Sequence, residues 1–300
     1  MLKDFVIAGV QISIKPNDIE YNLEKIVTWL NKAVEVHKAQ LVVFPETIST
    51  GFSPGYSPEE LWDKIDYVPG RLTNPVAKSA KENGVYVILP TYERGEKRGV
   101  VYNSAVLIGP DGNIIGKHSK THLFPTERLQ GGGWTTPGNK IEVFETDLAN
   151  IGITICYEGD FPELSRILAV KGAEVIVRPS ALLRSYDIWE MTNKARAYDN
   201  HVYMIGVNSV GSDAAGKNYF GHSMIISPIA QKLALARGTE EIVYARLDSD
   251  PLKYVSYGVD SPMIFDHLED RNLSVYEGLT DEAKSKFEPY KRIPYKKSNK

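Results

Sequence analysis

The stretch Ile151-Gly-Ile-Thr-Ile-Cys156-Tyr-Glu-Gly-Asp-Phe-Pro-Glu163 contains the only cysteine of the chain. Its first half is apolar and rich in β-branched residues, which predicts a strand over 151–156. Pro162 is typical of the first turn of a helix, and we expect one over 161–171. A strand-to-helix turn presents a side chain at the rim of a sheet, where the next backbone N–H can face a developing oxyanion. Position alone does not make Cys156 catalytic, because a lone cysteine at a strand end is more often an inert core residue.

Strand-like and helix-like segments alternate on both sides of this stretch, which predicts a mixed α/β layer structure. The runs 101–108 and 113–118 flank Gly109-Pro110-Asp111-Gly112, a sequence typical of a β-hairpin, so part of the sheet must be antiparallel. A second hairpin is expected around 224–236. The other predicted strands are 5–14, 41–44, 85–90, 140–144, 174–177 and 202–208, and the other predicted helices are 19–34, 74–83 and 187–199, with a short one from Pro58.

The composition argues against several classes of protein. The 300 residues include 35 Lys and Arg against 38 Asp and Glu, and the net charge of −3 argues against a chain that binds nucleic acid or anionic lipid through bulk charge. No stretch approaches the roughly 20 apolar residues of a membrane-spanning helix, and 5–14 resembles a strand more than a signal peptide. We therefore expect a cytoplasmic protein. A single cysteine excludes an intramolecular disulfide and a cysteine-based zinc cluster.

Two other reactive side chains also follow predicted strands. Glu46 comes just after the run 41–44, and Lys120 comes just after the run 113–118. A thiol with a pKa of about 8.5 needs a base at neutral pH, and a partly buried carboxylate can act as that base. A neighbouring ammonium lowers the pKa of a thiol and can neutralise an oxyanion. Glu46, Lys120 and Cys156 therefore form a candidate catalytic set.

Three motifs that contain these residues occur in a fixed order along the chain, namely Phe44-Pro45-Glu46, Lys120-Thr-His-Leu-Phe and Cys156-Tyr-Glu-Gly-Asp-Phe-Pro-Glu163. Together they resemble the nitrilase superfamily, the carbon–nitrogen hydrolases with a Glu-Lys-Cys triad. The resemblance covers residues 1–258, which we expect to form one carbon–nitrogen hydrolase domain, with 259–300 as a C-terminal extension. It implies a four-layer α-β-β-α sandwich, with two mixed sheets face to face and helices outside.

The resemblance also implies a mechanism that needs no metal and no cofactor. Glu46 would take the thiol proton while Cys156 attacks a small-molecule amide. Lys120 and the N–H of Tyr157 would stabilise the oxyanion. Ammonia would leave with the proton from Glu46, and water would then hydrolyse the thioester. Glu127 matches a second glutamate of the family, which would orient Lys120 and the substrate amide.

The resemblance extends to residues around the substrate. Tyr157 and Glu158 follow the nucleophile, and Arg178 and Ser180 follow the predicted strand 174–177, so we expect these four to shape the substrate pocket. The motifs are most similar to those of amidases, which predicts hydrolysis of a primary amide. An N-carbamoyl amine or amino acid hydrolase is the alternative. A nitrilase is less favoured because Tyr157 stands where nitrilases usually carry Trp, and the intact triad argues against an inactive scaffold or binding protein.

Histidines support two rival interpretations. His118 and His122 are four residues apart, with Asp111 and Glu127 nearby as possible metal ligands, but the segment does not resemble a helix that would place two ligands on one face. A Cys-His hydrolase would pair Cys156 with His201 or His222. Neither histidine lies in a recognisable catalytic motif.

Two acidic residues beside the nucleophile bear on substrate charge. If Glu158 or Asp160 faces the pocket, a substrate carboxylate meets like charge, at a cost on the order of 1–4 kcal/mol. On that condition we expect a preference for neutral or amine-bearing amides over N-carbamoyl amino acids. Arg178 could equally neutralise Glu158.

Association is expected as well, since the family typically pairs protomers through the helices near the cysteine and lets C-terminal segments cross to the partner. The chain beyond Asp260 is polar and aperiodic, yet it carries aromatic residues that a free tail would expose, namely Tyr276, Phe287, Tyr290 and Tyr295. We therefore predict a homodimer or higher homo-oligomer.

Overall fold

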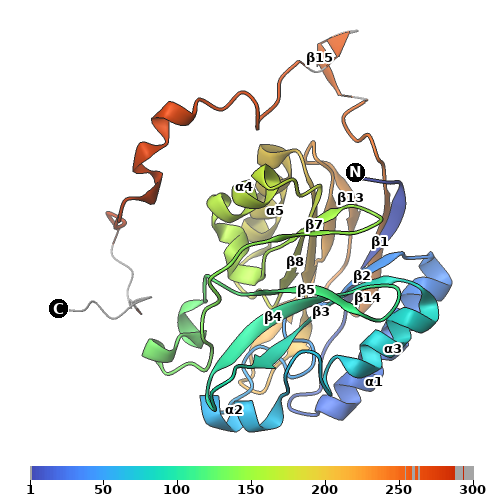
Figure 1. Cartoon of the computed structure of the whole chain (residues 1–300), viewed down its shortest axis with the longest axis vertical. Coiled ribbons are helices and arrows are strands. Elements are labelled where there is room, and N and C mark those ends of the chain that lie inside the picture. Colours follow the sequence, from blue (N-terminus) through green and yellow to red (C-terminus); the bar gives the residue numbers. More distant parts are fainter. Residues whose placement is uncertain (1, 254, 259–260, 263, 288–292, 294–300) are drawn as a thin grey trace.

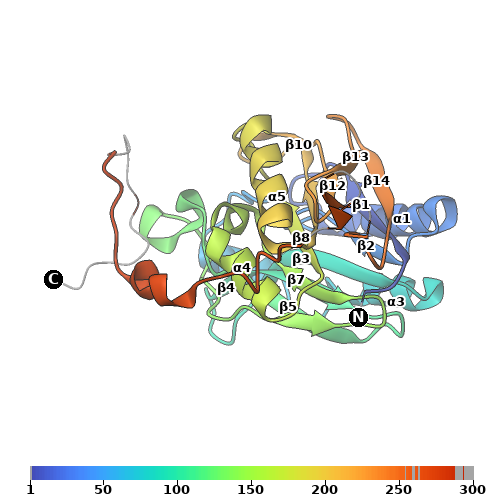
Figure 2. The same cartoon turned by 90° about the horizontal axis from the view of Figure 1, so that it is seen from above.

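Two six-stranded sheets pack face to face in the computed structural model, which describes residues 2–253, 255–258, 261–262, 264–287 and 293. Helices α1 and α3 lie on one outer side, and α4 and α5 lie on the other (Figures 1 and 2). This arrangement confirms the predicted four-layer α-β-β-α sandwich.

The first sheet has the strand order β14-β1-β2-β3-β4-β5. Strands β1, β2 and β3 are parallel, and β14, β4 and β5 are antiparallel to their neighbours. The hairpin predicted around 109–112 is confirmed as the connection from β4 to β5. The bounds are β1 Phe5–Gln11, β2 Leu41–Val43, β3 Tyr86–Arg94, β4 Val101–Ile108, β5 Ile114–Ser119 and β14 Glu241–Leu247.

The second sheet repeats the pattern with the order β13-β12-β9-β8-β7-β6. Its central strands β7, β8 and β9 are parallel, and the outer ones are antiparallel. The bounds are β6 Val143–Glu145, β7 Asn150–Ile153, β8 Val175–Ser180, β9 Tyr203–Asn208, β12 Met224–Ile226 and β13 Lys232–Leu235. Two short ladders lie outside both sheets, β10 Val210–Ser212 with β11 Asn218–Phe220, and β15 Ser256–Gly258 with β16 Ser261–Pro262.

The helices begin at residues that suit helix N-termini. Asp18 accepts from the N–H of Tyr21 at the start of α1, and Ser57 and Glu60 form a capping box at the start of α2. The α-helices are α1 Ile19–His37, α2 Pro58–Lys64, α3 Asn74–Asn83, α4 Pro162–Val170 and α5 Tyr186–Asn200. The 3-10 turns are Pro125–Glu127, Leu129–Gly131, Cys156–Asp160, Leu273–Val275 and Glu277–Thr280.

Alternation along the strands builds two cores. Ile7, Val43 and Ile88 point into the core shared by the two sheets. Their neighbours Ala8 and Val42 point to the opposite face, where they pack with the apolar faces of α1 and α3. Successive side chains of a strand point to opposite faces, and both faces of these strands are buried. The strands are therefore apolar along their whole length.

Strand β14 is absent from the sequence-based prediction, which ended with the hairpin over 224–236. It pairs with β1 along its whole length and closes one edge of the first sheet. Its side chains are mostly half-buried or exposed because β14 lies at the edge. A weakly apolar edge strand gives a weaker periodic signal than the central strands.

The C-terminal extension leaves the body after β14 and passes over one end of the sandwich (Figures 1 and 2). It returns to contact it near α4 and α5, where Arg166 donates to the carbonyl of His267 at 3.1 Å. Tyr276 and Phe287 are exposed, and Tyr290 and Tyr295 lie outside the described residues. Among the helices that the structure describes, none combines the length and the apolar character needed to cross a membrane.

Candidate active site

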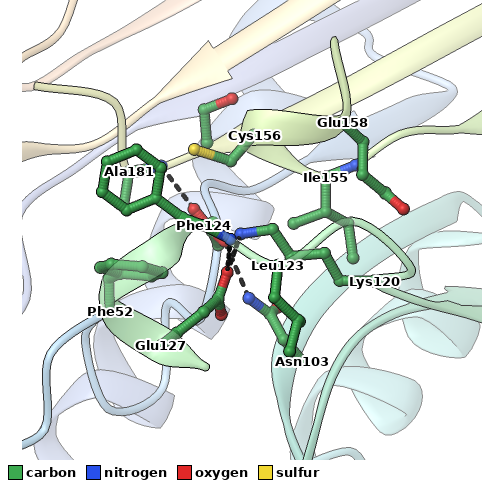
Figure 3. Close-up of polar contacts among 12 residues, drawn as sticks. Phe52, Asn103, Lys120, Leu123, Phe124, Glu127, Ile155, Cys156, Glu158 and Ala181 are labelled. Carbon is green, nitrogen blue, oxygen red and sulfur yellow. Dashed lines mark hydrogen bonds and ion pairs between the residues drawn. The ribbon is translucent and has the colours of Figure 1, made fainter. Parts of the chain in front are cut away.

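Three strand ends bring the predicted catalytic set together. Glu46 lies just after β2, Lys120 directly after β5, and Cys156 just after β7. Glu46 and Lys120 follow strands of the first sheet, and Cys156 follows a strand of the second. Because the two sheets face each other, these strand ends meet at one rim. Figure 3 shows Lys120, Glu127 and Cys156 gathered around one space with Phe52 and Phe124 beside them.

A single ammonium joins two buried carboxylates. Lys120 Nζ lies 2.7 Å from Glu46 Oε1 and 2.6 Å from Glu127 Oε1, and all three side chains are fully buried. Burial alone would lower the pKa of Lys120, but Glu127 and Glu46 outweigh it and hold the pKa above its ordinary value. The Lys120 side chain is therefore an ammonium at neutral pH.

The Glu46 carboxylate is held from two further directions. Asn103 Nδ2 donates to Oε1 at 2.8 Å, and the backbone N–H of Ala181 donates to Oε2 at 2.9 Å. Asn103 was not among the predicted site residues. Its signal in the sequence is the one amide in the largely buried strand β4, where a fully buried polar side chain needs a partner.

Glu127 lies in the 3-10 turn Pro125–Glu127, and its carboxylate is only half satisfied. Oε1 accepts from the N–H of Phe124 at 2.8 Å, whereas Oε2 is buried and has no hydrogen-bond partner among the described residues. Burial raises the pKa of Glu127, although Lys120 acts in the opposite direction. Gly133 packs so closely that a Cβ there would lie 2.2 Å from the Glu127 carbonyl carbon, which explains a glycine in the loop.

Cys156 begins the 3-10 turn Cys156–Asp160 in a left-handed conformation, with a φ of 48°. The predicted strand over 151–156 thus ends early, at Ile153. A non-glycine residue at positive φ is strained, and such residues gather at functional sites. Arg178 holds the turn, since its Nε donates to the Cys156 carbonyl at 2.8 Å. A Cβ at Gly159 would lie 2.0 Å from that Nε, so only glycine leaves room for the guanidinium.

The resting thiol is protonated. Burial raises the pKa of Cys156 to about 12, and Glu46 acts in the same direction, whereas Lys120 and Arg178 act against it. The ammonium lowers the pKa of the thiol as expected from the sequence, but burial outweighs it. Attack therefore requires a base that takes the proton as the new bond forms.

Glu158 is turned away from this space (Figure 3). Its Oε1 accepts from the N–H and the hydroxyl of Thr121 at 2.7 and 2.6 Å, and its Oε2 contacts His118 Nε2 and the N–H of Ile155, both at 2.7 Å. Burial would raise the pKa of Glu158, but His118 and these hydrogen bonds lower it to about 2. Glu158 therefore ties the segment after β5 to the segment after β7.

Arg178 and Ser180 lie inside β8 instead of after it, because the strand extends to Ser180. Arg178 is fully buried and donates to Thr192 Oγ1 at 2.8 Å and to Asp160 Oδ1 at 3.0 Å. Ser180 Oγ donates to the Arg178 carbonyl at 3.2 Å. Arg178 thus supports the Cys156 turn, and Ser180 contacts the backbone of Arg178.

A narrow pocket of about 20 Å³ opens onto the thiol, enough for about one water molecule. It is lined by Phe52, Phe124, Cys156, Ala181, Leu182, Leu183 and Arg184. Among the four residues expected to bind substrate, Tyr157 packs against two residues of this lining, with its ring 5.4 Å from that of Phe124 and 5.6 Å from the Arg184 guanidinium. Arg184 was missed, because a lone arginine in a loop carries no motif.

The histidines have partners outside this cluster. His118 contacts Glu158, and the His122 Nδ1 contacts Thr121 Oγ1 at 2.9 Å. His201 packs against the ring of His267, and His222 Nδ1 contacts the Phe220 carbonyl. Over the residues that the structure describes, no group of three or more His, Cys, Asp or Glu side chains is arranged to hold a metal ion.

Comparisons with known proteins agree with this geometry. The family model described as carbon-nitrogen hydrolase matches residues 6–255. The omega-amidase NIT2 of Xenopus tropicalis is 32% identical over 255 residues, covering 83% of this chain and 90% of that protein. The probable nitrilase C965.09 of Schizosaccharomyces pombe is 31% identical over 277 residues, covering 91% and 97%.

Solved structures share the fold. Nit3 of Saccharomyces cerevisiae, a member of branch 10 of the nitrilase superfamily, has a TM-score of 0.74 at 27% identity over 83% of this chain and 92% of its own. An amidase from Nesterenkonia sp. has a TM-score of 0.76 at 21% identity over 92% and 96%, a likeness of fold. The chain belongs to the carbon-nitrogen hydrolase family of the nitrilase superfamily.

Proposed function

We propose that this carbon–nitrogen hydrolase cleaves a primary amide to an acid and ammonia through a thioester on Cys156. The observation that carries the proposal is the buried cluster in which Lys120 bridges Glu46 and Glu127 at 2.7 and 2.6 Å beside the thiol. The pocket lined by Phe52, Phe124 and Cys156 also supports the proposal, because it opens onto the thiol.

Acylation begins with proton transfer. Glu46 takes the proton from Sγ as sulfur bonds to the amide carbon, and the carbonyl electron pair moves to oxygen. The Lys120 ammonium and the backbone N–H of Tyr157 stabilise that oxyanion. The carbon–nitrogen bond then breaks, and the nitrogen leaves as ammonia with the proton that Glu46 held.

Deacylation uses the same groups in reverse order. Glu46, again a carboxylate, takes a proton from water as the hydroxide oxygen bonds to the thioester carbon. The tetrahedral intermediate expels the sulfur, which regains its proton from Glu46, and the acid is released. Asn103 and the N–H of Ala181 keep the Glu46 carboxylate oriented through both steps.

The unmatched Oε2 of Glu127 provides a place for the substrate nitrogen. A buried acceptor without a partner costs about 1–3 kcal/mol, and an amide N–H that binds there removes the cost. A primary amide has two N–H groups, so one can donate to Glu127 Oε2 while the other points away from it. Glu127 also orients Lys120 through its other oxygen.

A second candidate function is hydrolysis of an N-carbamoyl amino acid, whose ureido carbonyl is the same kind of electrophile. The specific observation in its favour is Arg184, a cation in the pocket lining. An acidic side chain that faced the pocket would disfavour such substrates. Glu158, however, faces away from the pocket, and Asp160 pairs with Arg178 and Arg184.

Ammonia release from primary amides, N-carbamoyl compounds and nitriles separates the candidates. We expect the highest kcat/KM for a primary amide, and none of this activity in Cys156→Ala. A higher value for an N-carbamoyl amino acid would favour the second candidate. No release from any of the three classes would favour the inactive scaffold. Activity lost to EDTA and restored by zinc would contradict the thioester mechanism.

We also propose that the protein forms a homodimer through α4, α5 and the extension over 259–300. Apolar side chains are exposed on α4 and α5 and again along the extension, namely Ile167, Val170, Ile188, Met191, Leu273, Val275, Leu279 and Phe287. We expect a sedimentation mass of twice 33.5 kDa for the full chain and a lower association constant for Met191→Lys. A mass of 33.5 kDa at micromolar concentration would contradict the dimer.

A further inference from the structure

The two oxygens of the Glu46 carboxylate differ in how many donors they accept. Oε1 accepts from Lys120 Nζ at 2.7 Å and from Asn103 Nδ2 at 2.8 Å. Oε2 accepts from the backbone N–H of Ala181 at 2.9 Å, its one donor among the described residues. Each carboxylate oxygen has about two lone-pair sites, so Oε1 is fully occupied, whereas Oε2 keeps one site for a proton.

The backbone N–H of Ala181 also acts on the thiol. Burial and Glu46 raise the pKa of Cys156, and a hydrogen bond from the Ala181 N–H acts against them. Ala181 and Cys156 both line the pocket, and Figure 3 shows the sulfur beside Ala181. One N–H therefore lies between the oxygen that has room for a proton and the sulfur that must lose one.

The peptide that carries this N–H is held from both sides. Its carbonyl belongs to Ser180, the last residue of β8, and accepts from the N–H of Ser209 at 3.0 Å. On the other side, Asn208 Oδ1 accepts from the N–H of Leu182 at 2.7 Å, and Asn208 Nδ2 donates to the Leu182 carbonyl at 3.1 Å. Because a peptide is planar, fixing the Ser180 carbonyl also fixes the direction of the Ala181 N–H.

A donor shared by base and nucleophile differs from a donor on the base alone. A donor that touches only the carboxylate stabilises it before the proton moves and so makes it a weaker base. When the proton moves from Sγ to Oε2, negative charge leaves the carboxylate and develops on sulfur. The hydrogen bond to Oε2 then weakens as the one to Sγ strengthens. A fixed N–H between the two atoms therefore stabilises the charge throughout the transfer and keeps the atoms within reach of each other.

We propose that the backbone N–H of Ala181 is a catalytic group that bridges the base and the nucleophile, and that Oε2 of Glu46 takes the thiol proton. The inference rests on the proposed function and adds a group to it. The S–H bond breaks as the Oε2–H bond forms, and the electron pair left on sulfur bonds to the amide carbon. Oε1 stays bound to Lys120 and Asn103, so the ammonium remains in place for the oxyanion.

Replacement of one backbone amide by an ester tests this group, because the ester keeps the side chain and lacks only the N–H. Lactic acid at position 181 removes the N–H of Ala181. The matched control is 2-hydroxy-3-methylpentanoic acid at position 155, which removes the N–H of Ile155. Both N–H groups donate to a buried glutamate, the first to Glu46 at 2.9 Å and the second to Glu158 at 2.7 Å. The structural losses should therefore be similar, and only the Ala181 N–H touches reacting atoms.

Two rates are measured for each ester, namely kcat for a primary amide and the rate of alkylation of Cys156 by chloroacetamide, which reports on thiolate formation alone. The Ala181 ester should lower kcat at least about 100-fold and alkylation at least about 10-fold. The Ile155 ester should lower kcat less than about 10-fold and alkylation less than about threefold. Equal losses in the two esters would overturn the bridging role. No ammonia release by the wild type would instead reject the proposed function.

Asn103→Leu tests the choice of oxygen without a change in the backbone. Asn103 Oδ1 has no hydrogen-bond partner among the described residues, so the variant loses one contact of its side chain, the donor to Oε1. A carboxylate with fewer donors is a stronger base, and Oε2 keeps its place beside the thiol. We therefore expect alkylation of Cys156 at least as fast as in the wild type. An alkylation rate more than about 10-fold below that of the wild type would show that Oε1 is the base and overturn the assignment.

Discussion

Glu127 and Glu158 are two equally buried glutamates in 3-10 turns that adjoin the same cluster, and their surroundings are opposite. Both oxygens of Glu158 accept hydrogen bonds, and the pKa of the carboxyl falls to about 2. Glu127 has one oxygen without a partner among the described residues, and burial raises its pKa. A fully satisfied carboxylate holds the framework, and we propose that the incompletely satisfied one binds the substrate.

The largest effect is expected for removal of the thiol. Cys156→Ala should lower kcat/KM by at least about 10⁴-fold, because no other group in the pocket can form the thioester. The change removes one sulfur atom from a strained turn, so the fold should persist. Steady-state ammonia release and the near-ultraviolet circular dichroism spectrum check both statements. Turnover close to that of the wild type would refute covalent catalysis by Cys156.

Glu127→Gln should be the next largest effect, a loss of about 10²–10³-fold in kcat with little change in stability. The amide keeps the shape but cannot balance the charge of Lys120 or accept from the substrate with the same strength. Single-turnover rates at pH 7 provide the measurement. A loss below about threefold would show that Glu127 belongs to the framework, like Glu158.

Glu158→Gln should instead lower stability, by on the order of 3 kcal/mol at neutral pH, and reduce kcat of the folded protein less than about 10-fold. The pKa of Glu158 is lowered on folding, so the carboxylate stabilises the fold fully above its unfolded pKa of 4.5. That stabilisation is lost as the pH falls from 4.5 toward about 2. The unfolding free energies of the variant and the wild type should therefore converge over this range. Parallel curves down to pH 3 would contradict the assignment.

The smallest effect is expected for Ser180→Ala. Ser180 Oγ donates only to the Arg178 carbonyl, at 3.2 Å, in the contacts that the structure describes. Removal should cost about 1 kcal/mol of stability and change KM less than about twofold. A tenfold rise in KM at unchanged kcat would support the substrate-binding role that the sequence predicts for Ser180.

Much of the site follows from the sequence because strand ends are marked by local signals. Pro45 after β2, the hairpin glycines before β5 and Pro162 after Cys156 delimit the elements that carry Glu46, Lys120 and Cys156. The four-layer fold follows from the resemblance that these motifs carry, and the two sheets confirm it.

The direction in which a side chain points does not follow from the sequence. Glu158 is two residues from the nucleophile, yet it faces His118 because the 3-10 turn rotates it away. Arg184 is distant along the chain but lines the pocket. Asn103 on β4 reaches Glu46, which follows β2, because β3 alone separates these two strands in the folded sheet. These contacts depend on tertiary packing, which no local pattern encodes.

The central claim is that all substrates pass through the same thioester on Cys156. It is tested most directly when hydroxylamine competes with water for that thioester. A primary amide, its N-methyl amide and the ethyl ester of the same acid are hydrolysed in the presence of hydroxylamine, and the ratio of hydroxamate to acid is measured. One common acyl-enzyme predicts the same ratio for every substrate that turns over, whatever group leaves. A ratio that changes with the leaving group, or acid without hydroxamate from all of them, would contradict a thioester intermediate.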